Sequence, residues 1–229
     1  MYPRAIDYVK ITVFGFALTA LYQSLHSIVL PLRLLDFIQE SQKNSYLSYI
    51  TIAGLALAFF IQPLAGAFSD RTSSRLGRRR PYILAGGILA VLVIPGFGLA
   101  GGYAGLFLTY CLLQCSTNIA QGPYQGLIPD MIPESRHGTA SGVKGLLEVT
   151  GGIALVYLSS RWMDNYYTGG GAEWLWMVIA SLAGVTLITI VITVITVKEP
   201  PIVSVQKRTP LLATLISTFK TDIRRNHGF

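Results

Sequence analysis

Long apolar runs separated by short polar segments form the main pattern of the chain. A helix needs about 20 apolar residues to cross the hydrocarbon core of a bilayer, and six stretches of roughly this length are present. They occupy residues 11–32, 46–68, 82–99, 103–127, 139–159 and 174–197. We therefore predict an all-α integral membrane protein whose residues 1–197 form a bundle of six transmembrane helices.

The composition supports this assignment. Of the 229 residues, 52% are hydrophobic and 13% are charged, whereas soluble domains carry about 25% charged residues. A disordered chain is excluded as well, because such chains are poor in apolar residues. Cys111 and Cys115 lie in an apolar run and provide neither a disulfide framework nor a metal-ligand spacing. The sequence contains no nucleophile–base arrangement, so we expect no enzymatic activity, no metal and no cofactor.

The distribution of positive charge predicts the orientation. Fourteen of the 18 Lys and Arg residues fall on the side that holds both termini, while Arg33, Lys43 and Arg161 fall on the other. Cytoplasmic loops carry the excess of Lys and Arg, so both termini are expected in the cytoplasm, with the helices in the plasma (inner) membrane among its lipids. Because topology accounts for the net charge of +7, a nucleic-acid partner is not expected.

A polar, basic segment follows the sixth predicted span. Residues 198–229 contain six of the Lys and Arg residues. Within this segment, residues 210–225 place apolar side chains at helical spacing, which is typical of a helix lying on the membrane surface. We predict a cytoplasmic tail with one amphipathic interfacial helix.

The connection between the second and third spans is the most specific segment. It runs Gly66-Ala-Phe-Ser-Asp-Arg-Thr-Ser-Ser-Arg-Leu-Gly-Arg-Arg-Arg-Pro81. Asp70 ends a helix, where an anion is unfavourable unless a helix N-terminus or an arginine compensates it. Gly77 permits a sharp turn, and Pro81 suits the first turn of the next helix. The simplest interpretation is a positive-inside loop, but that function does not require this specific order of residues.

This loop resembles the signature between helices two and three of the major facilitator superfamily. Its longer form resembles that of the glycoside–pentoside–hexuronide:cation symporters and the sucrose transporters. A second segment, Asn118-Ile-Ala-Gln-Gly-Pro-Tyr-Gln-Gly-Leu-Ile-Pro-Asp130, is similar to the stretch at the end of helix four in those families. Sucrose transporters often carry an arginine near the position of Gln125, so the resemblance does not extend to sucrose itself.

The resemblance implies half of a twelve-helix protein, built from two inverted three-helix repeats. A second six-helix half, either another copy of this chain or a separate chain, would then enclose the solute. In the family the loop residues help to latch the two halves. The latch residues carried over are Gly66, Asp70, Arg71, Arg75, Gly77, Arg78, Arg79, Arg80, Asp130 and Arg136.

Ionisable side chains within a span are costly, and each is therefore a functional candidate. Lys144 and Glu148 are four residues apart, which puts them on one helix face, and we expect them to take part in proton coupling. The alternative is that Lys144 extends to the membrane surface while Glu148 balances its charge. His26, with Gln23, is a candidate for binding sugar hydroxyls or a proton; the alternative is a hydrogen bond to a neighbouring helix.

An amide stripe marks the fourth span. Its members are Gln114, Asn118, Gln121 and Gln125, and intervals of four, three and four residues place them on one helix face. Amides provide both donors and an acceptor, which suits a polyhydroxylated solute. Hydrogen bonding between helices is the alternative role.

These features predict a half-sized major-facilitator-type transporter for a sugar-like small molecule, with a proton as co-substrate. Because one scaffold can serve several functions, two alternatives stay open. One is a non-transporting membrane subunit or assembly factor, for example of a photosynthetic complex. The other is a truncated product without independent activity.

Overall fold

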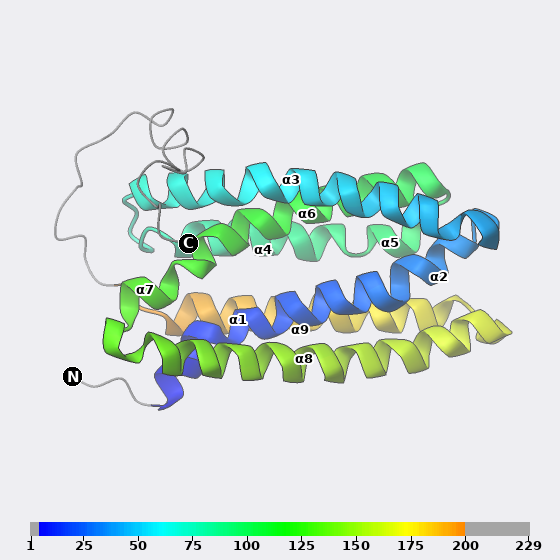
Figure 1. The fold of residues 1–229 in the computed structure, drawn as a ribbon. Helices are drawn as coiled ribbons and strands as arrows, with labels where there is room; N and C mark the ends of the chain where they lie inside the picture. Colours follow the sequence, from blue (N-terminus) through cyan, green and yellow to red (C-terminus); the bar gives the residue numbers. More distant parts are fainter. Residues whose placement is uncertain (1–4, 200–229) are drawn as a thin grey trace, which may run out of the picture.

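The structure is a computed structural model that describes residues 5–199 of the chain. Every regular element within this range is a helix, and the long helices lie side by side along one axis (Figure 1). They are α1 (Ala5–Ser24), α3 (Lys43–Arg71), α4 (Arg80–Val93), α6 (Tyr103–Gln125), α8 (His137–Asn165) and α9 (Ala172–Thr196). The predicted all-α bundle is confirmed. The interfacial helix predicted at residues 210–225 lies outside the described residues.

The first span is longer than predicted and contains a wider turn. After α1 the chain forms a π-helical turn, η1 (Leu25–Val29), and continues as α2 (Leu30–Leu35). Pro31 lies in the first turn of α2; it has no N–H to donate, and its ring crowds the preceding turn. A π-helical turn is rare and, inside an α-helix, often lies at a functional site. His26 is part of this turn.

The third and fourth spans divide at a glycine cluster, where the sequence predicts the division. α4 leads through Pro95 into the short α5 (Gly96–Leu99), and α6 begins after Gly102. Beyond α6, the chain forms α7 (Leu127–Met131). The remaining short elements are η2 (Glu40–Gln42), η3 (Glu134–Arg136) and η4 (Tyr166–Gly170).

Within residues 5–199, five helical stretches are long and apolar enough to cross a membrane. They are Ile6–Leu35, Glu40–Arg71, Arg80–Leu99, Glu134–Gly170 and Ala172–Thr196. α6, with 23 residues, is also long enough, but its amide side chains make it more polar. It lies against both α3 and α4, and Gln114 and Asn118 are buried. The bundle therefore shields these two amides from lipid.

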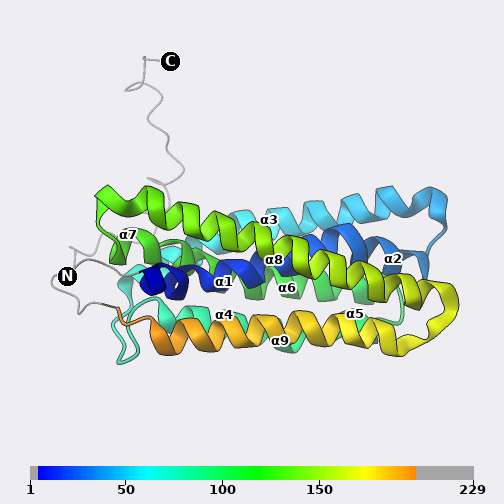
Figure 2. The ribbon, with the colours of Figure 1, turned by 90° about the horizontal axis from the view of Figure 1, so that it is seen from below.

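Helix pairing follows a symmetric pattern. α1 packs against α8 and α9, while α6 packs against α3 and α4; α4 also contacts α9. Figure 2 shows α3 and α8 on one side of the bundle, α4 and α9 on the other, and α1 and α6 between them. Exchanging the first three long helices with the last three reproduces these contacts, as expected for two repeats related by a pseudo-twofold axis.

A buried arginine joins the helix ends opposite the α3–α4 loop. Arg33 is 6% exposed, and it donates from Nε to the Phe97 carbonyl (3.1 Å) and from Nη2 to the Ala100 carbonyl (2.9 Å). Its Nη1 also pairs with Asp36 and donates to Tyr166 Oη. These contacts satisfy carbonyl groups left without partners where α5 ends.

Candidate functional site

The buried half of the amide stripe belongs to a hydrogen-bond network between helices. Gln114 Nε2 donates to Tyr110 Oη (2.7 Å), and Tyr22 Oη of α1 donates to Gln114 Oε1 (2.7 Å). Asn118 Nδ2 donates to the Gln114 side chain (3.1 Å) and main chain (2.8 Å). His26 Nε2 lies 2.6 Å from Tyr110 Oη. His26, Gln114 and Asn118 are thus brought together and bonded within the chain.

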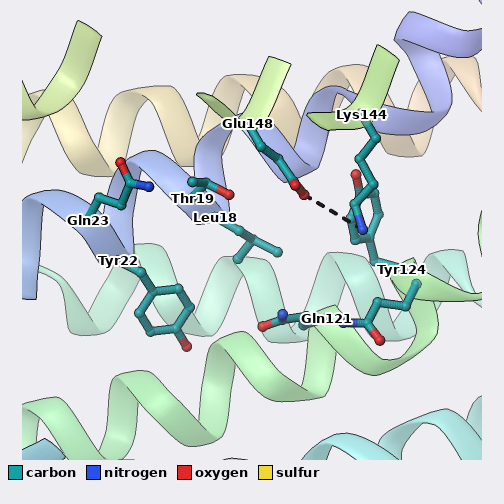
Figure 3. Close-up of a pocket in the computed structure, with 9 residues that line it drawn as sticks. Leu18, Thr19, Tyr22, Gln23, Gln121, Tyr124, Lys144 and Glu148 are labelled. Atoms are coloured by element: carbon teal, nitrogen blue, oxygen red, sulfur yellow. Dashed lines mark ion pairs between the residues drawn. The ribbon is translucent and has the colours of Figure 1, made fainter. Parts of the chain in front are cut away.

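The other half of the stripe lines a cavity of about 170 Å³ between α1, α6 and α8 (Figure 3). Its wall consists of Leu18, Thr19, Tyr22, Gln23, Gln121, Tyr124, Gln125, Lys144 and Glu148. Five of the predicted site residues therefore meet here: three amides and the ion pair. Tyr22 belongs to both the cavity wall and the buried network, so it connects the two groups of predicted site residues.

Lys144 and Glu148 form the predicted pair, with 3.7 Å between Nζ and Oε1. Both side chains are partly exposed, and the Lys144 ammonium lies 5.5 Å from the centre of the Tyr124 ring. An ammonium over an aromatic face is attracted by the negative potential of the ring. The cavity therefore contains a cation, a carboxylate and several neutral hydrogen-bonding groups.

Glycines allow the α8 and α1 groups to approach one another. A Cβ atom at Gly152 of α8 would lie 2.1 Å from Gln23 Oε1, and one at Gly15 of α1 would lie 2.7 Å from Glu148 Oε1. Neither side chain could occupy its observed place against an alanine. Gly138 and Gly142 differ, since a Cβ atom at either would meet nothing within 4 Å in the described part of the chain.

A second, more apolar cavity of about 620 Å³ lies between α3 and α6. It is lined by Leu55, Ala58, Phe59, Gln62, Pro63, Gly66, Gly122 and Gln125. Gln125 contributes to both cavities, so they are neighbours on one side of the bundle. The sequence analysis did not identify this cavity. Gln62, the single amide of the second predicted span, is the residue in its wall that could have indicated it.

The α3–α4 loop centres on Arg79, whose side chain is 8% exposed. Arg79 Nη2 lies 3.1 Å from Asp70 Oδ1, Nε pairs with Asp130, and Nη1 donates to the Pro123 carbonyl (3.3 Å). Arg78 also pairs with Asp130. A Cβ atom at Gly126 would lie 2.0 Å from Arg79 Cζ, so that glycine makes room for the guanidinium. Asp70 was predicted to require an arginine or a helix N-terminus nearby, and Arg79 of the same chain is that partner.

Glu199 is a member of this cluster that the sequence analysis missed. Its carboxylate accepts hydrogen bonds from the backbone N–H groups of Arg78 (2.8 Å), Arg79 (3.0 Å) and Arg80 (2.9 Å). These groups begin α4, where N–H groups lack helical partners and an anion is favoured. Gly77 has φ of 103° and leaves no room for a Cβ beside this carboxylate. The sequence shows Glu199 only as a single acidic residue after the last span, and nothing nearby predicts its contact with the start of α4.

Charge in the cluster shifts the pKa of two groups. Partial burial of the Asp130 carboxyl acts to raise its pKa, but hydrogen bonds from Arg79 and Arg78 outweigh burial and lower it. Burial acts to lower the pKa of Arg78, and Asp130 reverses this effect so that the pKa rises. Both shifts favour the charged forms of the groups.

The other loop residues lie at the same end of the bundle. Arg71 ends α3, and Arg75 lies in the loop; both are exposed. Arg136 is exposed at the end of η3, and Arg80 donates from its side chain to the Val194 carbonyl. A Cβ atom at Gly66 would meet nothing within 4 Å among residues 5–199.

Comparison with known proteins identifies the family. The family described as MFS/sugar transport protein matches residues 13–221. The chain is 33% identical over 118 residues to sucrose transport protein SUT1 of Oryza sativa subsp. japonica, which is 42% of this chain and 22% of that protein. It is 28% identical over 139 residues to sucrose transport protein SUC4 of Arabidopsis thaliana, covering 52% of this chain and 27% of that protein.

A human protein is also similar. The chain is 33% identical over 163 residues to proton-associated sugar transporter A of Homo sapiens, covering 64% of this chain and 22% of that protein. The alignments with these three relatives thus cover about a quarter of each relative's length. The family match covers most of the chain and agrees with the helical bundle and the apolar spans. The chain is a member of the MFS/sugar transport protein family of integral membrane proteins.

Proposed function

We propose that this chain transports a sugar-like solute across the plasma (inner) membrane, with a proton as co-substrate, as one six-helix half of a complete transporter. The observation that carries the proposal is the cavity between α1, α6 and α8, which combines three amides with an ion pair. The names of the similar proteins, sucrose transport proteins and a proton-associated sugar transporter, support the same class of solute.

The cavity chemistry suits a polyhydroxylated molecule. Each of Gln23, Gln121 and Gln125 offers an N–H₂ donor and a carbonyl acceptor, and Thr19 adds a hydroxyl. A neutral sugar needs many moderate hydrogen bonds of both kinds. The buried network of His26, Gln114 and Asn118 contacts the cavity wall through the Tyr22–Gln114 hydrogen bond and so holds Tyr22 in place. In this proposal His26 binds the solute when its hydrogen bond to Tyr110 breaks.

Glu148 is the proposed proton carrier. It is an acid within a span, where a charge is costly unless it is paired, and Lys144 is its partner at 3.7 Å. Taking up a proton removes the pair's attraction and leaves Lys144 as the charged group in the cavity. In this proposal the solute and the proton bind in one cavity, so each can affect the binding of the other directly.

The second half, a copy of this chain or a separate chain, covers the side on which α3 and α8 lie (Figure 2). Apolar side chains are exposed there on both helices, such as Leu55 (70%) on α3 and Ile153 (67%) on α8. Gly66, Gly138 and Gly142 leave open positions on the same two helices, and small residues allow close helix contact in membranes. α8 lines the first cavity and α3 lines the second.

The Arg79 cluster latches this half in the proposed transport cycle, at the cytoplasmic end with both termini. The end that carries it holds most of the positive charge, in keeping with the positive-inside rule. Asp70 is 53% exposed while it pairs with Arg79, so one side of its carboxylate faces outward from the bundle. A basic group of the second half would bind there when the halves close.

The test is uptake by vesicles that contain the chain together with any protein that remains bound to it. Radiolabelled sucrose and a panel of mono- and disaccharides serve as probes, with an inward proton gradient. We expect Glu148→Gln to lose driven uptake but retain exchange, because exchange needs no net proton movement. Glu134→Gln, an exposed acid in η3, is the matched control. Driven uptake that survives Glu148→Gln would remove this residue from coupling.

A further inference from the structure

One position on α1 brings two oxygen atoms from other helices together. A Cβ atom at Gly15 would lie 2.6 Å from Tyr124 Oη of α6 and 2.7 Å from Glu148 Oε1 of α8. Both side chains thus occupy the space left by one missing methyl group. Figure 3 shows the Glu148 carboxylate directed toward Lys144 and the Tyr124 ring beside that pair.

The Tyr124 hydroxyl is already bonded to the α1 backbone. It donates its single hydrogen to the Thr12 carbonyl (2.9 Å) and accepts the Gly15 N–H (3.0 Å). The ring packs edge-to-face on Phe14, with 5.2 Å between centroids. A phenolic oxygen has two lone pairs, so one acceptor site remains. Tyr124 is therefore held firmly and can accept one more hydrogen bond, but it has no hydrogen left to donate.

This inventory separates the two protonation states of Glu148. The ionised carboxylate is an acceptor only; it gains nothing from Tyr124 and pairs with Lys144. When Glu148 takes a proton from solution, one carboxyl oxygen becomes an O–H donor and the attraction to Lys144 is lost. The remaining lone pair of Tyr124 is an acceptor for that hydrogen, because both oxygens lie beside the same Gly15 position.

We propose that Tyr124 is the positioning residue for proton coupling, because its hydroxyl, fixed on α1 beside Gly15, accepts the hydrogen bond of protonated Glu148 when that side chain leaves Lys144. This inference rests on the proposed proton-coupled transport and adds the residue that transmits it. When Glu148 is ionised, it pairs with Lys144 on the same helix and makes no hydrogen bond to α1 or α6 in this scheme. In the protonated state α8 is tied through Tyr124 to α1 and α6.

The exchange of partners affects the cavity wall through α1. Thr19, Tyr22 and Gln23 follow Gly15 on this helix and line the cavity. The titratable or charged groups that face Glu148 from the packed elements are Lys144 on α8, Tyr124 on α6 and Tyr22 on α1. Lys144 lies over the Tyr124 ring, and in the proposed exchange Glu148 is the residue that changes its hydrogen-bond partner.

The test measures the hydrogen bond of protonated Glu148 directly. Infrared difference spectra between neutral and acidic pH, recorded on the purified chain in liposomes, contain the carbonyl stretching band of each carboxyl group that takes up a proton. Glu148→Gln identifies the Glu148 band by removing it. In Tyr124→Phe, which keeps the ring but loses the hydroxyl, we expect this band to move to higher frequency because the acid loses its acceptor.

Three further variants control for packing. Tyr8→Phe removes the hydroxyl of another buried tyrosine, which has no hydrogen-bond partner among the described residues, and should leave the Glu148 band unmoved. Gly15→Ala should move the band as Tyr124→Phe does, because a Cβ atom separates the two oxygens. Gly145→Ala should not move it, because a Cβ atom there meets nothing within 4 Å in the described part of the chain.

The outcomes separate this inference from the proposed function. A Glu148 band that keeps its frequency in Tyr124→Phe and Gly15→Ala would overturn the role of Tyr124, while proton-driven uptake could still hold. If no band disappears in Glu148→Gln, this residue takes up no proton, and both the role of Tyr124 and the coupling by Glu148 fail.

Discussion

At the scale of single residues, buried positive charge shapes both ends of the molecule. Among the described residues, Arg33 and Arg79 are the charged side chains in the buried class, at 6% and 7% exposure. Each has carboxylate and carbonyl partners: Asp36 at the end of its own helix and Phe97 of α5 for the first, and Asp130 of α7 and Pro123 of α6 for the second. A buried charge without partners would cost several kcal/mol, so these contacts decide which helix ends stay together.

Asp130 makes stability depend on pH in a defined direction. Its pKa in the folded protein is lowered from 3.8 by Arg79 and Arg78, against the effect of burial. A carboxyl group with a lowered folded pKa stabilises the fold above its unfolded pKa, and this contribution is lost as pH falls through the folded value. We expect the melting temperature to fall as pH drops below about 3.8, with a smaller acid-induced fall in Asp130→Asn. Asp164→Asn, an exposed acid near the opposite end, should melt like the parent; equal acid sensitivity in Asp130→Asn would contradict the assignment.

Glu199 should contribute to stability as a helix cap. Three backbone N–H groups at the start of α4 lose their partner in Glu199→Ala. A lost cap costs about 0.5–2 kcal/mol, so we expect a lower melting temperature in detergent. Glu199→Gln should retain part of the effect, because the amide oxygen still accepts. Glu134→Ala, which removes an exposed acid, is the control. If Glu199→Ala has the same melting temperature as Glu134→Ala and the parent, the cap contributes nothing to stability.

At the scale of helices, apolar run length was sufficient to predict six spans and their order. The bounds of the apolar runs also predicted a break between residues 99 and 103, where the structure ends α5 and begins α6. The π turn before Pro31 was not predicted, because proline alone does not distinguish a kink from a widened turn. The sequence also did not predict which glycines contact a neighbouring helix. Gly122 and Gly142 each belong to a pair of glycines four residues apart, yet Gly122 lies against the α3 backbone and Gly142 does not.

These two glycines give a matched pair of substitutions. A Cβ atom at Gly122 would lie 2.3 Å from the Gln62 carbonyl oxygen, part of the α3 backbone, whereas one at Gly142 would meet nothing within 4 Å among the described residues. Overpacking of a rigid contact costs typically about 1–3 kcal/mol. We therefore expect Gly122→Ala to lower the melting temperature in detergent and Gly142→Ala to leave it unchanged. Equal effects would show that α3 and α6 do not approach as closely as described.

At the scale of the whole molecule, the sequence indicated which residues are polar but not where they meet. The amide stripe forms one face of α6, but its members have different surroundings. Gln114 is hydrogen-bonded to Tyr22 of α1 and to Tyr110, while Gln121 and Gln125 line the cavity. The apolar cavity beside Gln125 depends on the meeting of α3 with α6, and no local pattern encodes that contact. Family resemblance located the loop cluster, but Glu199 joined it only through the packing of α9 against α4.

The decisive measurement follows proton movement driven by sugar. The chain, purified in mild detergent with any protein that stays bound, is placed in liposomes that hold a pH-sensitive dye, and sucrose or another sugar of the panel is added outside without an ion gradient. The account predicts that the interior acidifies as radiolabelled sugar enters, because each solute is accompanied by a proton. Sugar entry without acidification would contradict proton coupling, and entry of none of the sugars would contradict the assignment of the cavity to this class of solute.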